Sequence, residues 1–277
     1  MKIAVVIPVL DEVEQISGAL ASVMRGRVGA APGSAIRGST LGTDLGAQSG
    51  TDPGAGPGAD PGADPDTDPG TDPDTDPGTD PGPEVLVVDG GSRDGTAERA
   101  RELGARVLTA PRGRARQLEA GWRASAGEVV VFLHADTRLE PGWEGALRGA
   151  LADPGVVGGA FRLRFDAPGV VFRWVESIVS MRVRLFSLPY GDQAIFVRRS
   201  ILSAMGGVPA VEIMEDLDLV RELNRRGAVV ALRPAAITSA RRYCDRGLVG
   251  TLFRNALGLA AWRLGVGRTR IARWVGR

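Results

Sequence analysis

Cysteine is almost absent, because Cys244 is the only one in 277 residues. An internal disulfide is therefore excluded, which is consistent with a reducing compartment. Long apolar runs are also lacking, since no stretch of about 18 uncharged apolar residues predicts a transmembrane helix. The apolar run that opens the chain is too short for a signal peptide and is interrupted by Pro8, Asp11 and Glu12. We expect a cytoplasmic protein, with the inner face of the cell membrane as a further location.

Lysine, arginine, glutamate and the aromatic residues are missing from residues 38–83, which carry ten aspartates in near-repeats of Asp-Pro-Gly and Thr-Asp-Pro. Such a segment buries too little apolar surface to offset the entropy lost on ordering. We predict a disordered insertion over residues 27–83. Without its ten aspartates the chain has 34 basic and 33 − 10 = 23 acidic residues, a net charge of +11. That charge suits an anionic ligand or an anionic membrane surface, and a genomic bias toward arginine explains it equally well.

The first half of the remaining sequence alternates β-branched runs with segments of helical periodicity. This alternation predicts a Rossmann-like, mostly parallel sheet with helices on both faces, the α/β class. The predicted strands are 2–9, 84–88, 106–108 and 128–133, and the predicted helices are 12–24, 94–103, 113–124 and 141–151.

The second half of the sequence predicts strands and helices in a less regular order. We expect strands at 156–165, 193–197 and 228–232, and helices at 170–186 and 214–226. Residues 1–26 and 84–247 would form one globular domain, followed by a basic, amphipathic helical segment at 248–277.

Acidic residues follow three predicted strands: Asp11 and Glu12 the first, Asp89 the second, and Asp136 the fourth. Ligands of open α/β sheets bind outside the carboxyl ends of the strands. One acidic residue at a strand end is usually a cap or a turn residue. Three such ends converging on one edge of a sheet favour a ligand site.

Asp136 is the candidate metal ligand, because Mg²⁺ and Mn²⁺ prefer oxygen ligands and share them with substrate phosphates. His134, the only histidine, would point to the same face as Asp136 if the segment is extended. A lone histidine is also common as a packing residue, so both alternatives stay open.

A second acidic cluster, Glu215, Asp216 and Asp218, opens the helix predicted at 214–226. The helix dipole favours acidic residues in a first turn and explains one or two of them. Adjacent side chains on a helix diverge by about 100°. Glu215 and Asp216 must therefore differ in role: one can face a cleft as a base while its neighbours hold the other.

Five motifs, IPVLDE, VVDGGSRDGT, LHADT, YGDQ and MEDLDLVREL, resemble in order and spacing the family 2 glycosyltransferases, which have the GT-A fold. They are most similar to the bacterial branch of radical-SAM/selenodomain-associated transferases. The resemblance spans the chain apart from the insertion and the last 30 residues.

The resemblance implies a role for each motif residue. Asp216 would be the general base, and Asp136 the acid of an Asp-x-Asp-like metal site with His134 beside it. The nucleotide would be bound by Pro8, Asp11, Glu12, Asp89, Ser92, Asp94, Arg112 and Arg114. The donor sugar and acceptor would be bordered by Gly191, Asp192, Gln193 and Glu215.

Two positions depart from the family pattern. Asp11 stands where many relatives have asparagine, and His134 where many have aspartate. The second departure removes a carboxylate from the metal site, which implies a lower metal affinity with water or phosphate completing the coordination.

The resemblance implies an inverting, hexosyltransferase-like enzyme that uses a UDP- or GDP-sugar and a divalent metal. Its acceptor is unidentified, a lipid-linked acceptor and peripheral membrane association are compatible with it, and no nucleic-acid partner is expected. Residues 170–186 and the C-terminal segment fit interfacial helices, or helices packed on the body with their arginines in water.

Two other functions stay open. One is a catalytically degenerate, membrane-associated protein that binds nucleotide-sugars. The other is a sugar-nucleotide nucleotidyltransferase, which should carry a glycine-rich basic loop where this chain has Pro-Val-Leu-Asp-Glu.

Overall fold

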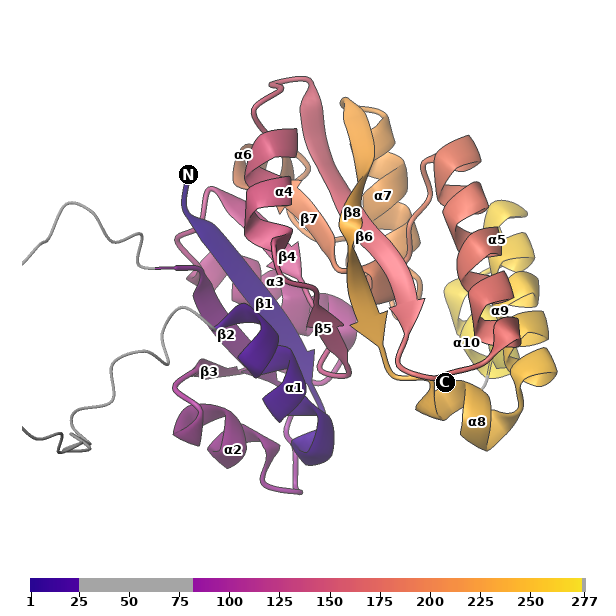
Figure 1. Ribbon diagram of the computed structural model, residues 1–277, viewed down its shortest axis with the longest axis horizontal. Helices are drawn as coiled ribbons and strands as arrows, with labels where there is room; N and C mark the ends of the chain where they lie inside the picture. The colour runs from indigo at the N-terminus through magenta and orange to yellow at the C-terminus, as the bar shows by residue number, and fades with distance from the viewer. Residues whose placement is uncertain (25–81, 276–277) are drawn as a thin grey trace, which may run out of the picture. The chain divides into compact units, whose positions relative to one another are not determined.

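The computed structural model describes residues 1–24 and 82–275, so the predicted insertion lies almost wholly outside the described residues. These residues contain an eight-stranded sheet in the order β3-β2-β1-β4-β7-β6-β8-β5 (Figure 1). Its strands are β1 (Ile3–Val9), β2 (Glu84–Asp89), β3 (Arg106–Thr109), β4 (Val129–Phe132), β5 (Thr137–Leu139), β6 (Val156–Phe165), β7 (Ile195–Arg198) and β8 (Ala228–Thr238).

The first half of the sheet is parallel, because β3, β2, β1 and β4 all run in one direction. The central strand β1 is buried on both sides, and Val5, Val6 and Ile7 are fully inaccessible. A continuous apolar run is what a parallel strand covered on both faces requires. The carboxyl ends of these four strands therefore meet at one edge of the sheet.

The second half of the sheet is mixed. Strand β7 is antiparallel to β4 and β6, β8 is parallel to β6, and β5 is antiparallel to β8. The prediction of a mostly parallel sheet is confirmed, with antiparallel pairs confined to this half. Neither β5 nor the short helix α6 (Arg199–Ala204) was predicted, and β8 extends six residues beyond the predicted end at Leu232.

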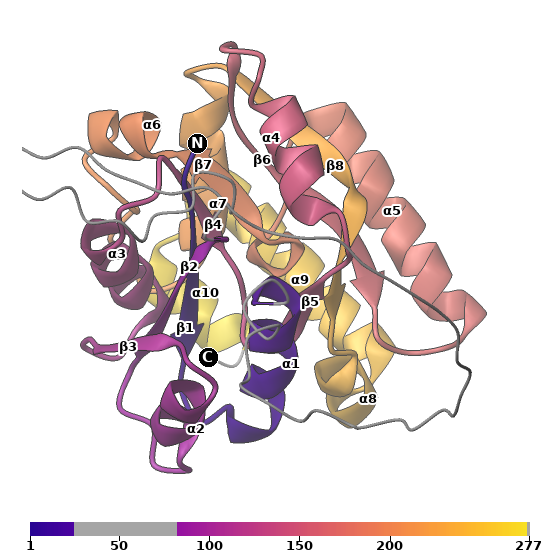
Figure 2. The same cartoon turned by 60° about the vertical axis from the view of Figure 1, so that its left-hand side comes forward.

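Helices cover both faces of the sheet, as predicted. One face carries α1 (Val13–Val23), α2 (Thr96–Glu102) and α4 (Trp143–Ala150) around a core that includes Ile16, Leu20 and Leu147 (Figures 1 and 2). The other carries α3 (Arg114–Ala124) and α7 (Glu215–Asn224) around a core with Trp122 and Leu223.

Helix α3 lies very close to β1 because Gly121 has no side chain. A Cβ atom at Gly121 would stand 2.3 Å from Cγ1 of Val6. This contact sets the depth at which α3 packs, and with it the position of Arg114 at the start of the same helix.

The last helices of the described residues are α8 (Arg241–Arg246), α9 (Leu248–Arg263) and α10 (Arg268–Val275), which come after α5 (Val170–Phe186) and the short 3-10 helix η1 (Gly191–Gln193) in the chain. One buried carboxylate ties α9 and α10 to α7. Asp218 of α7 accepts a hydrogen bond from Nε1 of Trp262 at 3.0 Å and pairs with Arg268. In the described part of the chain, no helix is long and apolar enough to cross a membrane.

Candidate active site

The loops after β1 and β2 are joined through their polar side chains at the carboxyl edge of the sheet. The Asp11 carboxylate accepts the Arg93 N–H at 2.8 Å, and the Asp11 N–H donates to Oγ of Ser92 at 3.0 Å. Asp89 accepts hydrogen bonds from the N–H of Ser92 at 3.0 Å and from its Oγ at 2.5 Å. Asp11 has φ 55°, a left-handed conformation that aspartate tolerates better than most residues. These contacts hold Asp11, Ser92 and Asp89 together, and Pro8 lies beside them in the β1–β2 ladder opposite Val88.

Asp94 and Glu12 join α1 to α2 in the same region. Asp94 accepts the N–H of Val13 and of Thr96, both at 3.0 Å, and the hydrogen bond from the Thr96 hydroxyl lowers the pKa of the Asp94 carboxyl. The Glu12 N–H donates to that hydroxyl at 2.9 Å, and its carboxylate pairs with Arg241 at 3.3 Å. The Asp94 carboxylate therefore positions the two helix starts.

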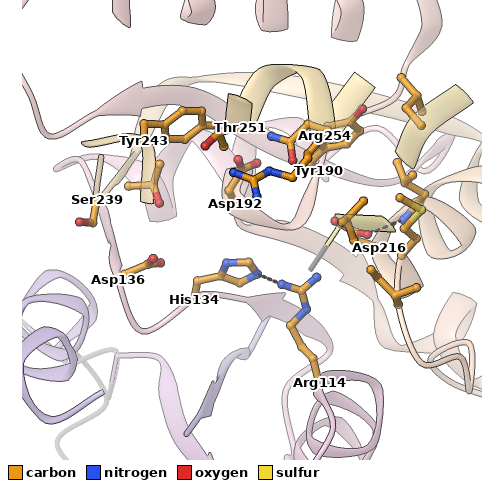
Figure 3. Close-up of a pocket in the computed structure, with 17 residues that line it drawn as sticks. Arg114, His134, Asp136, Tyr190, Asp192, Asp216, Ser239, Tyr243, Thr251 and Arg254 are labelled. Atoms are coloured by element: carbon orange, nitrogen blue, oxygen red, sulfur yellow. Dashed lines mark hydrogen bonds between the residues drawn. The ribbon is translucent and has the colours of Figure 1, made fainter. Parts of the chain in front are cut away.

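A cavity of about 420 Å³ opens beside the end of β4 (Figure 3). Its wall combines residues from α3, the β4–β5 turn, η1, α7 and the C-terminal helices. The polar and aromatic members are Arg114, His134, Asp136, Tyr190, Asp192, Asp216, Thr238, Ser239, Tyr243, Thr251, Arg254 and Asn255.

Asp216 reaches this cavity from the first turn of α7. The preceding Met214 has φ 65°, and this left-handed residue redirects the chain into the helix. Oδ2 of Asp216 accepts the N–H of Gly191 at 2.8 Å. A Cβ atom at Gly191 would lie 3.0 Å from Nε2 of His134 and 3.2 Å from Oδ2 of Asp216. Any larger residue at this position would require His134 or Asp216 to move by a few tenths of an ångström.

Glu215 is turned away from the cavity and is held by Arg114. The Glu215 side chain is 3% exposed and forms an ion pair with the Arg114 guanidinium. Burial lowers the pKa of Arg114, but the carboxylates of Glu215 and Asp216 outweigh it and raise that pKa above its ordinary value. The divergent placement of Glu215 and Asp216 agrees with the geometry expected of adjacent helical residues.

His134 lies 3.3 Å from the guanidinium of Arg114, measured at Nε2. Because a guanidinium only donates, Nε2 is the acceptor and the ring proton is on Nδ1. The expected extended segment around His134 is wrong, since the Thr137 N–H donates to the His134 carbonyl at 3.1 Å and closes a turn. His134 and Asp136 nevertheless line the same cavity.

Several predicted site residues lie outside the cavity wall. Arg112 is exposed, and the β1 and β2 edge residues form the separate cluster described above. Gln193 is 2% exposed, accepts the Tyr190 N–H at 3.1 Å and donates to the Phe161 carbonyl at 3.1 Å. These two hydrogen bonds indicate that Gln193 positions the backbone of Tyr190 against β6.

Tyr190 and helix α9 supply a part of the wall that was not predicted from sequence. Arg182 of α5 stacks over the Tyr190 ring at 3.5 Å. Burial raises the pKa of Tyr190, and Asp216 and Asp192 add to this against the opposing effect of Arg182. Thr251 and Arg254 are three residues apart on α9, a spacing that places them on one helical face.

The described residues contain no group of three or more His, Cys, Asp or Glu side chains that could hold a metal ion. Asp136 offers one carboxylate to the cavity, and Nε2 of His134 faces Arg114. These residues fit a metal that takes most of its ligands from substrate phosphates and water. They do not fit a site built from protein ligands alone.

Solved structures share this architecture over nearly the whole chain. Glucosyl-3-phosphoglycerate synthase from Mycobacterium tuberculosis, in complex with Mn²⁺, UDP and glucosyl-3-phosphoglycerate, is 20% identical and has a TM-score of 0.53, covering 96% of this chain and 81% of its own. Residues 1–349 of TarS from S. aureus are 15% identical with a TM-score of 0.55, covering 92% of this chain and 64% of that one. The fold is that of the GT-A glycosyltransferases.

The GT-A fold agrees with a sequence match. The family model of glycosyl transferase family 2 matches residues 76–202, a segment that includes Asp89, Asp136 and Asp192 but ends before Asp216. No curated protein matches the sequence. The radical-SAM/selenodomain branch stays a prediction.

Proposed function

We propose that this protein is an inverting glycosyltransferase that moves a sugar from a nucleoside diphosphate sugar to an acceptor hydroxyl. One observation carries the proposal: Asp136 of the β4–β5 turn, Asp192 of η1 and Asp216 of α7 line one cavity at the ligand-binding edge of a GT-A sheet. The match to glycosyl transferase family 2 supports the same reaction class.

Asp216 acts as the general base. The acceptor oxygen attacks C1 of the sugar from the side opposite the diphosphate, so a new C1–O bond forms as the C1–O bond to phosphate breaks. Asp216 takes the hydroxyl proton as attack proceeds. The Gly191 N–H fixes one carboxylate oxygen at 2.8 Å. Holding the acceptor oxygen in line with C1 and the leaving diphosphate, with the base beside it, lowers the entropic part of the barrier.

The nucleotide binds at the cluster of Asp11, Asp89 and Ser92, and the diphosphate extends from there toward Asp136. A divalent metal, when bound, neutralises charge on the leaving diphosphate. Asp136 would hold this metal together with phosphate oxygens. Arg114 adds a fixed positive charge to the cavity wall.

A UDP-sugar is the first donor to test, because structures of the M. tuberculosis neighbour contain UDP-glucose. Ligands stabilise the folded state by mass action, by about 2.7 kcal/mol at a hundredfold excess over Kd. UDP-, GDP- and dTDP-sugars are compared by thermal shift with and without Mn²⁺, and we expect one base to raise Tm more with metal. The absence of any shift at millimolar donor would contradict the proposal.

Asp136→Asn should weaken the Mn²⁺-dependent part of that thermal shift. Even outer-shell changes at metal sites cost about 10–100-fold in affinity, so loss of the carboxylate should cost at least as much. The metal-independent shift from the nucleotide should remain. Asp166→Asn, an exposed aspartate outside the cavity, is the matched control. An unchanged Mn²⁺ titration of Asp136→Asn would place the metal elsewhere.

Hydrolysis of the bound nucleotide-sugar separates the enzyme from a degenerate binding protein. A glycosyltransferase slowly releases free sugar and nucleoside diphosphate without an acceptor, whereas a binding protein leaves the donor intact. A nucleotidyltransferase would instead release pyrophosphate from a nucleoside triphosphate. The acceptor, a lipid-linked one included, and a location at the membrane's inner face remain predictions.

A further inference from the structure

Helix α5 carries a row of exposed apolar side chains along one side. Val170, Trp174, Ile178, Met181 and Leu185 are each more than half exposed, with values from 56 to 71%. Their spacing of four, four, three and four residues places them on one helical face. The helix has 17 residues, so the row is about 25 Å long. A contiguous apolar surface of this kind marks a contact with a partner or a lipid surface.

The opposite side of α5 is fixed to the protein body. Val175 and Val183 are 6% and 7% exposed, and Val175 packs in a core with Leu163 and Phe165 of β6. Figures 1 and 2 show α5 beside β6 and β8, at the margin of the described residues. The apolar row is therefore held outward by a helix whose inner face is already packed.

Helix α9 extends the exposed apolar surface. Phe253 and Leu257 are exposed on α9, as is Leu264 just beyond its end. The guanidinium of Arg263 lies 5.4 Å from the ring centroid of Phe186, which joins the ends of α5 and α9. We call these outward apolar side chains of α5 and α9, with Leu264, the apolar face.

Positive charge accompanies the apolar face. Arg184 and Arg263 are exposed on the same two helices. Glu176, the only acidic residue of α5, is already paired with Arg173 at 3.0 Å. Aromatic and aliphatic side chains beside arginines are the composition of helices that lie in a membrane interface. Arginines there reach the phosphates of anionic lipids.

We propose that the apolar face docks on an anionic lipid bilayer, with α5 lying in the interface. Trp174, Ile178 and Leu185 enter the boundary between headgroups and acyl chains, and the arginines contact lipid phosphate. The docking does not require the proposed glycosyl transfer, and the two can be tested separately.

Docking on this face brings the candidate active site close to the bilayer. Arg182 of α5 stacks on Tyr190, which lines the cavity. On α9, Thr251 and Arg254 line the cavity while Phe253 faces outward. The cavity and the apolar face are therefore separated by about one helix diameter, about 10 Å. An acceptor anchored in the same bilayer could reach Asp216 without leaving the membrane.

The test is sedimentation of the full chain with vesicles of phosphatidylcholine alone or with 30% phosphatidylglycerol. The triple variant Trp174→Glu, Ile178→Glu and Leu185→Glu should bind the anionic vesicles at least about tenfold more weakly, since each buried large side chain favours transfer from water. Wild-type binding should require the anionic lipid and fall with added salt.

A charge-matched control separates the apolar face from net charge. The variant Arg99→Ala, Arg101→Ala and Arg116→Ala removes three positive charges at exposed positions on α2 and α3. It should bind vesicles within about threefold of wild type. Equal binding by the Glu variant, or no binding by wild type, would overturn the proposal. A wild-type dimer that the Glu variant converts to monomer would instead assign the face to a second copy of the chain. Donor thermal shifts are measured alongside, so failure of docking and failure of donor binding are read out independently.

Discussion

Asp216→Asn is expected to lower kcat for sugar transfer by about 10²–10⁴-fold, the range that a positioned general base contributes. Asparagine keeps an oxygen that accepts the Gly191 N–H, so the start of α7 should be preserved. It has no carboxylate to take the acceptor proton. The donor Kd should therefore change by less than about threefold, because the loss falls on a step after donor binding.

The matched control for this experiment is Glu212→Gln. Glu212 is an exposed carboxylate four residues before Asp216, and its Oε2 accepts a hydrogen bond from Thr269 at 3.2 Å. Turnover of this control should remain close to wild type. If Asp216→Asn also turns over at nearly the wild-type rate, Asp216 is not the base. If its donor binding is lost as well, the variant has altered the cavity and the change in kcat reports positioning.

Arg114→Met should destabilise the fold by about 3–5 kcal/mol, because it leaves the carboxylate of Glu215 buried without its counter-charge. For a chain of this size that corresponds to a fall in Tm on the order of 10 °C. Glu215→Leu alone should cost less, because the Arg114 side chain is 24% exposed and water can reach it.

The double variant Arg114→Met with Glu215→Leu tests the cause of that instability. Replacing a buried ion pair with apolar side chains of similar volume is often neutral, so the double variant should recover most of the lost Tm. Its donor thermal shift should stay reduced, because Arg114 also lines the cavity. If the two single effects add without recovery, the pair does not act as a unit and Arg114 stabilises the fold through other contacts.

The parallel half of the fold could be predicted from sequence because its strands are buried on both sides. The apolar runs of β1, β2 and β4 indicate buried strands, and the helical periodicity between them indicates that the strands are parallel. Helix α5 and strand β6 have the predicted bounds. Predictability falls in the mixed half, where β7 pairs antiparallel with β4 through residues far apart in the chain. The short β7 segment carries no local signal for its partner or its direction.

The candidate site also has one part that could be predicted from sequence and one part that could not. The acidic residues after the strands could be placed at one edge of the sheet from sequence, because topology brings those strand ends together. Tyr243, Thr251 and Arg254 were missed because their place in the wall depends on how α8 and α9 return over the sheet. Asp218 fixes the end of α9 and the start of α10 through Trp262 and Arg268, two long-range pairings that no local pattern predicts.

Gly191 offers a simple criterion for comparing this chain with others of the same fold. The His134 side chain from the β4–β5 turn and the Asp216 side chain from α7 both lie next to the position that a Cβ atom would take. These two neighbours restrict the residue type at position 191. An alignment in which a larger residue replaces Gly191 would imply that either His134 or Asp216 has moved. Glycine at this position therefore indicates that the His134 imidazole and the Asp216 carboxylate can keep their close approach without such a shift.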